Sequence, residues 1–274
     1  MHMIDHQADF APNEHQIKTA IKNQEFEVYY QPKVMSSDKR IYGAESLVRW
    51  HHPQHGVIPA YKFITVAEDS GAIVKLDQYV LHQTCQMLEA TNKAGYQISI
   101  SVNVSPKTIE SIDFVALMSS VISQYNIAPE QLDLEITEHS AITNFSTVNE
   151  SLKACKELGV VVSLDDFGTG HSSLAVLKDL PVDIVKIPSH FIKDIETNEQ
   201  STTLLNHIVS LSHDLNLGTV VEGIEHQKQS DIVCASTAEK MQGYLYGRPL
   251  PKDDFINLLS KDSSRQANNF CKAL

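Results

Sequence analysis

The chain has 274 residues and a formal net charge of −12, from 22 Lys and Arg against 34 Asp and Glu. Nucleic-acid binding depends largely on basic side chains at phosphates, so this acidic balance predicts no DNA or RNA binding. No apolar run approaches the roughly 18 residues of a membrane-spanning helix, and no secretory signal is expected at the N-terminus. The four cysteines form no Cys-x-x-Cys pair, which predicts reduced thiols and a cytoplasmic protein.

Short β-branched or apolar runs recur along the chain, and most of them end in a polar residue. The predicted strands are Val28–Val34, Ile41–Trp50, Ile98–Val104, Leu132–Thr137, Val160–Leu164, Val182–Ile187, Leu217–Val221 and Met241–Tyr246. Helical periodicity predicts helices at about Asn13–Asn23 and over Phe63–Ala90, Phe114–Tyr125, Val148–Leu158 and Thr202–Leu215. Strands that alternate with helices in this way predict an α/β protein with a TIM (β/α)8 barrel.

The connection between the first two strands differs from the others. Only the segment Met35–Arg40 separates them, which is too short for a crossover helix, so we expect an antiparallel hairpin there. His51, His52 and His55 cluster around Pro53 and are interpreted as a loop. We expect a single barrel domain over residues 1–262, with the N-terminal helix included, and a flexible polar tail over residues 263–274.

Polar side chains stand at the ends of the predicted strands, on the face where barrels of this class carry their active sites. They are Glu45, Asn103, Glu135, Asp165, Asp166, Lys186, Glu222 and Gln242. Clustered carboxylates are costly to keep ionised in a partly buried site, and hard divalent cations with oxygen ligands remove the repulsion. The set predicts a Mg²⁺ or Mn²⁺ site, and the adjacent Asp165 and Asp166 could bridge two ions about 3.5–4 Å apart.

Strand periodicity adds Arg49 to this set. Glu45 and Arg49 share a face of their strand, so Arg49 is predicted to point toward the same mouth, where a guanidinium can hold a phosphate. Taken singly, each glutamate could be half of a structural ion pair, Asn103 a strand-end cap and Lys186 a rim lysine. The residues alone therefore indicate a metal-dependent TIM-barrel enzyme, with a lyase or enolase-type reaction as a competing interpretation.

Short motifs at these strand ends follow one another in an order that is typical of a single family. They are Tyr30-Gln31-Pro32, Glu45-Ser46-Leu47-Val48-Arg49-Trp50, Ser101-Val102-Asn103-Val104-Ser105, Leu134-Glu135-Ile136-Thr137-Glu138, Asp165-Asp166-Phe167-Gly168-Thr169-Gly170, Val185-Lys186-Ile187, Val221-Glu222-Gly223-Ile224-Glu225 and Gln242-Gly243-Tyr244-Leu245. Over about residues 14–258 the chain resembles the EAL domain, the cyclic di-GMP phosphodiesterase of bacterial second-messenger signalling. This resemblance implies a modified TIM barrel whose first strand is antiparallel, and metal-dependent hydrolysis of cyclic di-GMP to linear 5′-pGpG.

The resemblance also assigns roles to individual positions. The metal ligands that it implies, for two Mg²⁺ or Mn²⁺ ions bridged by Asp165, are Glu45, Asn103, Glu135, Asp165, Asp166 and Glu222. The residues that it places in catalysis are Lys186, Glu222 and Glu45, with Lys186 positioning or activating the attacking water. The residues that would contact substrate or lie just behind it are Gln31, Arg49 and Gln242. Glu138 would anchor the loop Asp166–Ser172, and a homodimer is among the partners that the resemblance allows.

Four departures from the family pattern are present. The signature Glu-Ala-Leu reads Glu45-Ser46-Leu47, His171 replaces a common tyrosine, Pro188 replaces a frequent aspartate, and Gln227–Lys240 lacks the usual glycine-cysteine-aspartate pattern. Ser46 should lie on the face opposite Glu45, toward the helices. None of the departures removes an expected metal ligand, so an active phosphodiesterase is predicted. The alternatives are a catalytically silent cyclic di-GMP receptor and a regulatory interaction domain that binds no nucleotide.

Overall fold

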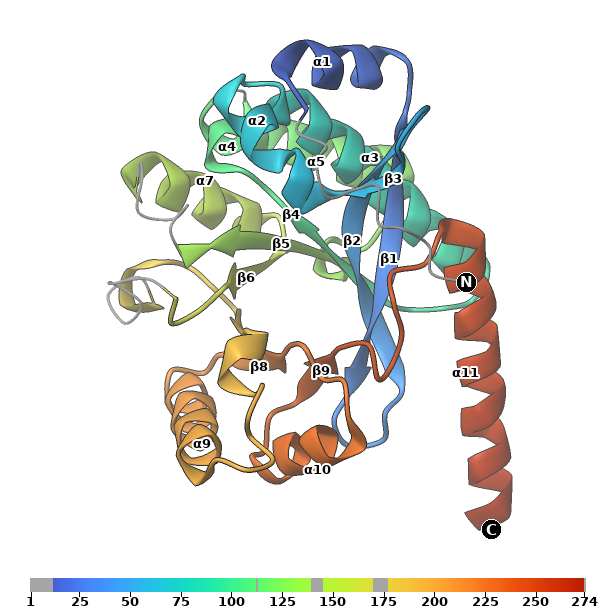
Figure 1. Ribbon diagram of the computed structural model, residues 1–274, viewed down its shortest axis with the longest axis vertical. Helices are drawn as coiled ribbons and strands as arrows, with labels where there is room; N and C mark the ends of the chain where they lie inside the picture. Colours follow the sequence, from blue (N-terminus) through green and yellow to red (C-terminus); the bar gives the residue numbers. More distant parts are fainter. Residues whose placement is uncertain (1–11, 112, 139–144, 170–176, 274) are drawn as a thin grey trace.

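A sheet that closes on itself forms the centre of the molecule (Figure 1). The computed structural model describes residues 12–111, 113–138, 145–169 and 177–273. The strands of the closed ring are β1 (Phe26–Met35), β2 (Ile41–His52), β4 (Ser99–Asn103), β5 (Leu132–Thr137), β6 (Val161–Asp165), β7 (Ile184–Ile187), β8 (Gly218–Val221) and β9 (Lys240–Gln242). The remaining strand, β3 (Gly56–Pro59), pairs with β2 outside the ring. The predicted TIM-type α/β barrel is confirmed.

The first strand runs against the rest of the barrel, as the short first connection predicts. β1 pairs antiparallel with β2 on one side and with β9 on the other. The other neighbouring strands of the ring pair in parallel, from β2–β4 round to β8–β9. Because parallel strands end on the same side, the polar residues at their carboxyl ends meet at one mouth.

The histidine cluster was predicted as a loop, and for two of its residues this is wrong. β2 continues through His52 and turns back into β3, so that His51 pairs with Val57 and His52 with Gly56. Buried Trp50 stands opposite buried Ile58 in the same ribbon. Cross-strand pairs of this kind stabilise a hairpin that the histidines alone do not signal.

The single long helix predicted over Phe63–Ala90 is also wrong. The segment forms η1 (Ala60–Lys62), α2 (Ile64–Asp69) and α3 (Ile73–Lys93). Between α2 and α3, Gly71 adopts a left-handed φ of +72°, which glycine accepts readily and which interrupts a right-handed helix. The Ser70 hydroxyl donates to the Val66 carbonyl at the end of α2. The break lets α3 turn its apolar side toward the barrel, where Leu76, Leu81 and Leu88 are buried.

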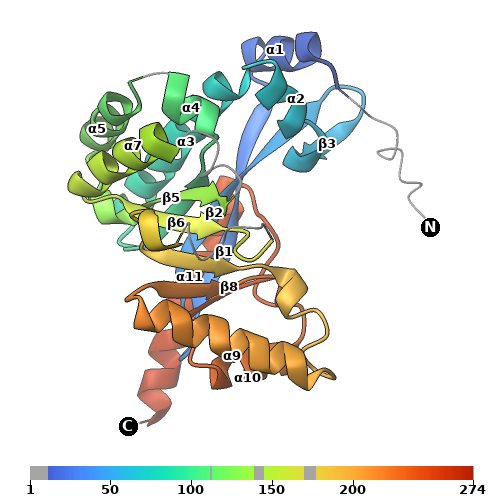
Figure 2. The ribbon, with the colours of Figure 1, turned by 90° about the vertical axis from the view of Figure 1, so that its left-hand side faces the viewer.

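The remaining helices surround the barrel in two groups (Figure 2). On one side lie α3, α4 (Pro106–Ser111), α5 (Phe114–Tyr125) and α7 (Phe145–Glu157), and on the other lie α9 (Glu199–Asp214) and α10 (Gln227–Ala235). The N-terminal helix α1 (Glu14–Lys22) begins at the cap residue Asn13 and lies beside α2. Short 3-10 turns precede β5 and follow β7, namely η2 (Pro129–Gln131) and η3 (Ser189–Phe191).

The last helix, α11 (Lys252–Ala273), leaves the barrel and extends away from it (Figure 1). Its first turns contact the barrel, where Phe255 and Leu259 are buried, and the Asp262 carboxylate accepts a hydrogen bond from the Ile41 backbone. The backbone is helical through residue 273, which includes most of the segment predicted as a tail. Among the described residues, no helix has the length and apolar character needed to cross a membrane.

Candidate active site

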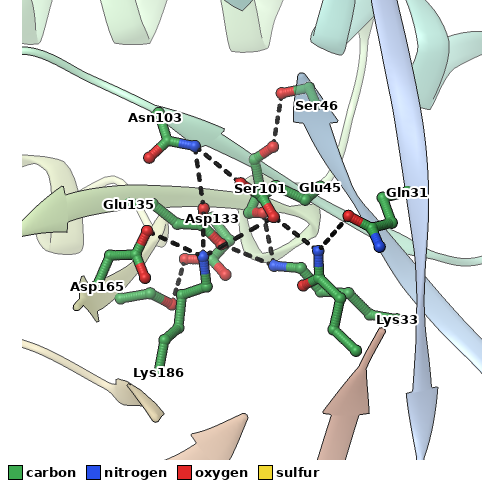
Figure 3. Close-up of polar contacts among 12 residues, drawn as sticks. Gln31, Lys33, Glu45, Ser46, Ser101, Asn103, Asp133, Glu135, Asp165 and Lys186 are labelled. Atoms are coloured by element: carbon green, nitrogen blue, oxygen red, sulfur yellow. Dashed lines mark hydrogen bonds and ion pairs between the residues drawn. The ribbon is translucent and has the colours of Figure 1, made fainter. Parts of the chain in front are cut away.

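The strand register brings most of the predicted polar residues together at the mouth of the barrel (Figure 3). Glu45 lies beside Ser101 across β2 and β4, and Asn103 lies beside Glu135 across β4 and β5. Thr137 lies beside Asp165 across β5 and β6. Lys186 belongs to β7, Glu222 directly follows β8, and Gln242 ends β9. Side chains from six strands, together with Glu222 just after β8, thus converge on one site.

Lys186 stands at the centre of the cluster. Its Nζ lies 2.8 Å from Glu135 Oε2, 2.8 Å from Glu222 Oε1, 3.1 Å from Asp165 Oδ2 and 3.9 Å from Glu45 Oε2. Burial alone would lower the pKa of this ammonium, but attraction to Asp165 and the three glutamates outweighs it and raises the pKa well above the ordinary value. Lys186 is therefore fully protonated in this arrangement.

Glu135 is held between two buried lysines. Its Oε2 contacts Lys186 and its Oε1 lies 2.8 Å from Lys33 Nζ, which also donates to the Ser101 hydroxyl at 2.6 Å. Burial would raise the pKa of this carboxyl, but attraction to Lys186 and Lys33 lowers it to about 2. Glu135 is fully buried and ionised, which is sustainable because both of its oxygens are paired.

Amide side chains hold Glu45 from two sides. Asn103 Nδ2 donates to Glu45 Oε1 at 3.0 Å and to Glu135 Oε2 at 3.3 Å. Gln242 Nε2 donates to Glu45 Oε2 at 2.7 Å and to Gln31 Oε1 at 3.2 Å. Two of the residues expected at the substrate, Gln31 and Gln242, therefore join the same hydrogen-bond network as the expected metal ligands.

Two glycines shape the backbone around Glu222 and Gln242. Gly223 has a φ of +74°, and a Cβ there would lie 2.2 Å from the Ser189 Cβ. A Cβ on Gly243 would lie 2.0 Å from the Ile224 carbonyl oxygen, because the backbone at residue 243 packs directly against the backbone at residue 224. Only glycine fits such close approaches, which explains the Glu222-Gly223 and Gln242-Gly243 pairs in the sequence.

Other predicted residues lie at the edge of the cluster. Asp166 follows Asp165 with a left-handed φ of +54°, and burial together with the Asp165 charge raises its pKa. Arg49 stays apart from the carboxylate contacts; its guanidinium donates to the Val48 carbonyl and lies 5.9 Å from the Tyr29 ring centre. Glu138 is buried. The proposed anchoring of Asp166–Ser172 by Glu138 falls partly outside the described residues.

Sequence reasoning missed Lys33. This side chain belongs to β1, is only 2% exposed and reaches Glu135 across the barrel. Near Lys33, buried Asp133 accepts a hydrogen bond from the Ser163 hydroxyl, and burial raises the pKa of Asp133 to about 6. The signal was the spacing of Gln31 and Lys33, two residues apart on one face of β1, which places both side chains inside the barrel.

The donor set fits a hard divalent cation. Burial raises the pKa of Glu222 to about 8 and also raises that of Glu45, so these carboxylates resist ionisation without a further positive charge. Gln242 Oε1 is buried and has no hydrogen-bond partner among the residues that the structure describes. Oxygen-only donors of this kind suit Mg²⁺ or Mn²⁺. In the part of the chain that the structure describes, no group of three acidic, histidine or cysteine side chains has the geometry of a metal site. The carboxylates of the mouth pair with Lys186 in this arrangement.

A cavity of about 340 Å³ opens beside the cluster. Its lining includes Glu45 and Glu222 from the charged network, Gln31 and Gln242 from the amide network, and Tyr244, whose side chain is 49% exposed. The guanidinium of Arg248 lies 4.2 Å from the centre of the Tyr244 ring. The cavity combines carboxylates, amides and an exposed aromatic ring, so it can receive a polar ligand that carries a planar group.

Three of the four departures from the family pattern lie in described residues. Ser46 is buried on the outer face of β2, opposite Glu45 as expected, and its hydroxyl donates to the Ser101 carbonyl at 2.6 Å. Pro188 leads from β7 into η3. The stretch Gln227–Lys240 forms α10 and the entry to β9. His171 lies outside the described residues.

A barrel with an antiparallel first strand and a mouth of carboxylates around a lysine defines a particular class of TIM-like barrel. The EAL domain family model matches residues 14–249, and the chain belongs to that family. Among solved structures, the chain is similar to the PaMucR phosphodiesterase in complex with c-di-GMP, with 33% identity, a TM-score of 0.83 and coverage of 88% of this chain and 98% of that one. It is also similar to an EAL domain protein from Listeria monocytogenes, with 31% identity, a TM-score of 0.78 and coverage of 92% and 99%.

Curated relatives are longer proteins. The signaling protein YkoW of Bacillus subtilis is 32% identical over 91% of this chain and 31% of its own length. The cyclic di-GMP phosphodiesterase NbdA of Pseudomonas aeruginosa is 34% identical over 87% of this chain and 30% of its own length. The chain thus spans about a third of the length of these relatives.

Proposed function

We propose that this chain is a phosphodiesterase that hydrolyses one phosphodiester bond of cyclic di-GMP, gives linear 5′-pGpG and requires Mg²⁺ or Mn²⁺, with two ions bound. The observation that carries the proposal is the convergence of Glu45, Glu135, Asp165 and Glu222 on Lys186 at one barrel mouth. The similarity to NbdA and to the PaMucR complex, whose names state this activity and ligand, supports the same substrate.

The cations would be held by the oxygen donors of the mouth, which are Glu45, Asn103, Glu135, Asp165, Asp166 and Glu222. When bound, divalent cations supply Lewis acidity at the phosphate and offset the negative charge of the attacking and leaving oxygens. Asp165 and Asp166 are adjacent in the chain at the end of β6, which suits the bridging role proposed for Asp165. Asn103 and Gln242 orient the Glu45 carboxylate through the hydrogen bonds described above.

Lys186 and Glu222 form the pair that handles the attacking water. The ammonium of Lys186 is held 2.8 Å from Glu222 Oε1, and its raised pKa keeps it protonated. Lys186 therefore orients the water and stabilises negative charge on the phosphate oxygens. Glu222 contacts this ammonium and lines the cavity, so it would support the same water while it helps to hold a cation.

The substrate would lie in the cavity next to the cations. Gln31 and Gln242 offer amide groups there, and the exposed ring of Tyr244 offers a face on which a guanine can stack. Arg49 follows Glu45 toward the carboxyl end of β2 and would contact a phosphate of the substrate or lie just behind the residues that do. Homodimer formation, a cytoplasmic location and the absence of DNA or RNA binding stay predictions.

Product chromatography tests the proposal. We expect the purified protein to convert cyclic di-GMP to pGpG with Mg²⁺ or Mn²⁺ and to stop when the metal is chelated. A matched preparation with Asp165→Asn, measured in the same buffer, excludes a contaminating hydrolase. Binding of cyclic di-GMP without any product under both metals would replace the phosphodiesterase with a silent receptor. If the protein neither binds cyclic di-GMP nor forms product, the regulatory interaction domain is the alternative that remains.

A further inference from the structure

Lys33 is a buried charge that the proposed chemistry does not use. It lies in β1, the one antiparallel strand of the ring, and the barrel wall encloses it so that it is 2% exposed. Its ammonium has two hydrogen-bond partners in the described residues, Glu135 and Ser101. Figure 3 shows it reaching Glu135 from a different strand than Lys186 does.

The two lysines divide the Glu135 carboxylate between them. Oε1 accepts from Lys33 at 2.8 Å, whereas Oε2 accepts from Lys186 at 2.8 Å and from Asn103 at 3.3 Å. A carboxylate whose two oxygens bind donors from β1, β4 and β7 cannot rotate about its terminal bond without breaking one of them. Lys33 therefore fixes the orientation of the Glu135 carboxylate and leaves one of its oxygens toward the centre of the mouth.

The charge of Lys33 by itself works against cation binding at this site. A positive charge that contacts a metal ligand repels a divalent cation nearby, and burying an ammonium is costly. An apolar residue at this inward-facing position would avoid both costs. What Lys33 adds beyond its charge is geometric, because its ammonium fixes the orientation of Glu135, a carboxylate that Asn103 of β4 and Lys186 of β7 also contact.

We propose that Lys33 is a positioning residue of the metal centre: by occupying Oε1 of Glu135, it leaves Oε2 as the single oxygen that this carboxylate directs to a divalent cation. The inference rests on the proposed function, in which Glu135 is a ligand. It assigns a role to a residue of β1 that lies outside the set of strand-end side chains.

Mn²⁺ affinity, measured without substrate by the electron paramagnetic resonance signal of free Mn²⁺, tests this role. Coulomb repulsion alone predicts tighter Mn²⁺ binding when Lys33 is neutralised, whereas lost positioning predicts weaker binding. We expect Lys33→Met to weaken Mn²⁺ binding about tenfold. Lys240→Met is the matched control, because Lys240 is also largely buried but lies over the Tyr42 ring, and it should stay within twofold of the parent protein.

A double-mutant cycle connects the effect to Glu135. If Lys33 acts through this carboxylate, Lys33→Met should change Mn²⁺ affinity less than twofold in a Glu135→Gln background. In steady-state assays of the single variant Lys33→Met, we expect kcat to fall more than tenfold while KM for cyclic di-GMP changes less than threefold. If Lys33 only filled space in the barrel, Lys33→Met would lower the melting temperature but leave Mn²⁺ affinity, kcat and KM unchanged.

Three outcomes would overturn the inference: unchanged Mn²⁺ affinity in Lys33→Met, tighter affinity, or equal weakening in the Glu135→Gln background. If Lys33→Met does not fold, Lys33→Gln is judged by the same criteria, because its neutral amide is too short to span both partners. Failure of the proposed function looks different, since the parent protein itself would then bind no Mn²⁺ or leave cyclic di-GMP intact.

Discussion

Glu45 and Ser46 are neighbours in β2 and both are buried, but they lie in two different regions of the molecule. Glu45 faces the inside of the barrel, where carboxylates, amides and two lysines contact one another. Ser46 faces the layer between the strands and the helices, which it shares with side chains such as Leu76 and Val80. Because successive side chains of a strand point to opposite faces, two neighbouring residues reach a charged interior and an apolar outer layer.

The comparison teaches how each region tolerates polar groups. Inside the barrel, Glu135 keeps its charge because two ammonium groups pair with it, and its pKa falls to about 2. In the outer layer, Asp77 of α3 accepts hydrogen bonds from the Ser105 backbone and the Thr108 hydroxyl, yet burial raises its pKa to about 7. Changes at the mouth should affect activity because those side chains surround Lys186, and changes in the outer layer should affect stability because they disturb packing.

The largest expected effect is that of Asp165→Asn, which removes a charge from the interior. Asp165 contacts Lys186 and is proposed to bridge two cations, so its loss should lower kcat/KM roughly 10²–10³-fold, about 3–4 kcal/mol. Asparagine is nearly isosteric with aspartate and Lys186 keeps its contacts with Glu135 and Glu222, so the melting temperature should change little. Steady-state hydrolysis and thermal unfolding of the same preparation check both parts. A rate close to that of the parent protein would remove Asp165 from the ligand set.

Leu134→Ala is the matching change in the outer layer. Leu134 lies between Asp133 and Glu135 in β5, is fully buried and points to the opposite face from both. Truncation should cost about 2–5 kcal/mol of unfolding free energy through lost contacts and a cavity. Chemical denaturation measures this cost. The kcat of the folded protein should stay within about threefold, and a selective loss of kcat would mean that the two regions are not separable.

Asp77→Asn examines a carboxylate of the outer layer whose pKa burial raises to about 7. A raised pKa means that the folded protein binds the proton more tightly than the unfolded chain does. Asp77 therefore adds stability below about pH 4, and this contribution is lost as the pH rises to about 7. Asparagine lacks this titration, so the stability of the variant relative to the parent should rise by about 1–3 kcal/mol over that range. Denaturation midpoints at pH 4 and pH 8 measure it; a constant difference would contradict the assignment.

Ser46→Ala should have the smallest effect. Its hydroxyl donates to the Ser101 carbonyl in the outer layer, and such a bond contributes about 1 kcal/mol or less. Activity should remain close to that of the parent protein, because Ser46 points away from the mouth. Glu45→Gln, one residue earlier, is the contrasting variant and should lose most of the activity. A large gain of turnover in Ser46→Ala would show that the serine restrains the site.

The sequence by itself determined the closed barrel, its antiparallel first strand and the polar residues of the mouth. These features depend on local quantities: strand alternation, the length of the Met35–Arg40 connection and the place where each strand ends. Parallel strands then leave little freedom, since their carboxyl ends must share one face. For this reason Glu45, Asn103, Glu135, Asp165 and Lys186 could be grouped before any contact was known.

Only the tertiary structure decided the contacts between distant segments. Lys33 contacts Glu135 across the barrel, and the local sequence around either residue does not predict this ion pair. The pairing of His51 with Val57 and the raised pKa of Asp77 likewise depend on what packs against those residues. Alternation can place a side chain on the inner or outer face, but burial, pKa and hydrogen-bond partners come from neighbours that the fold alone brings within reach.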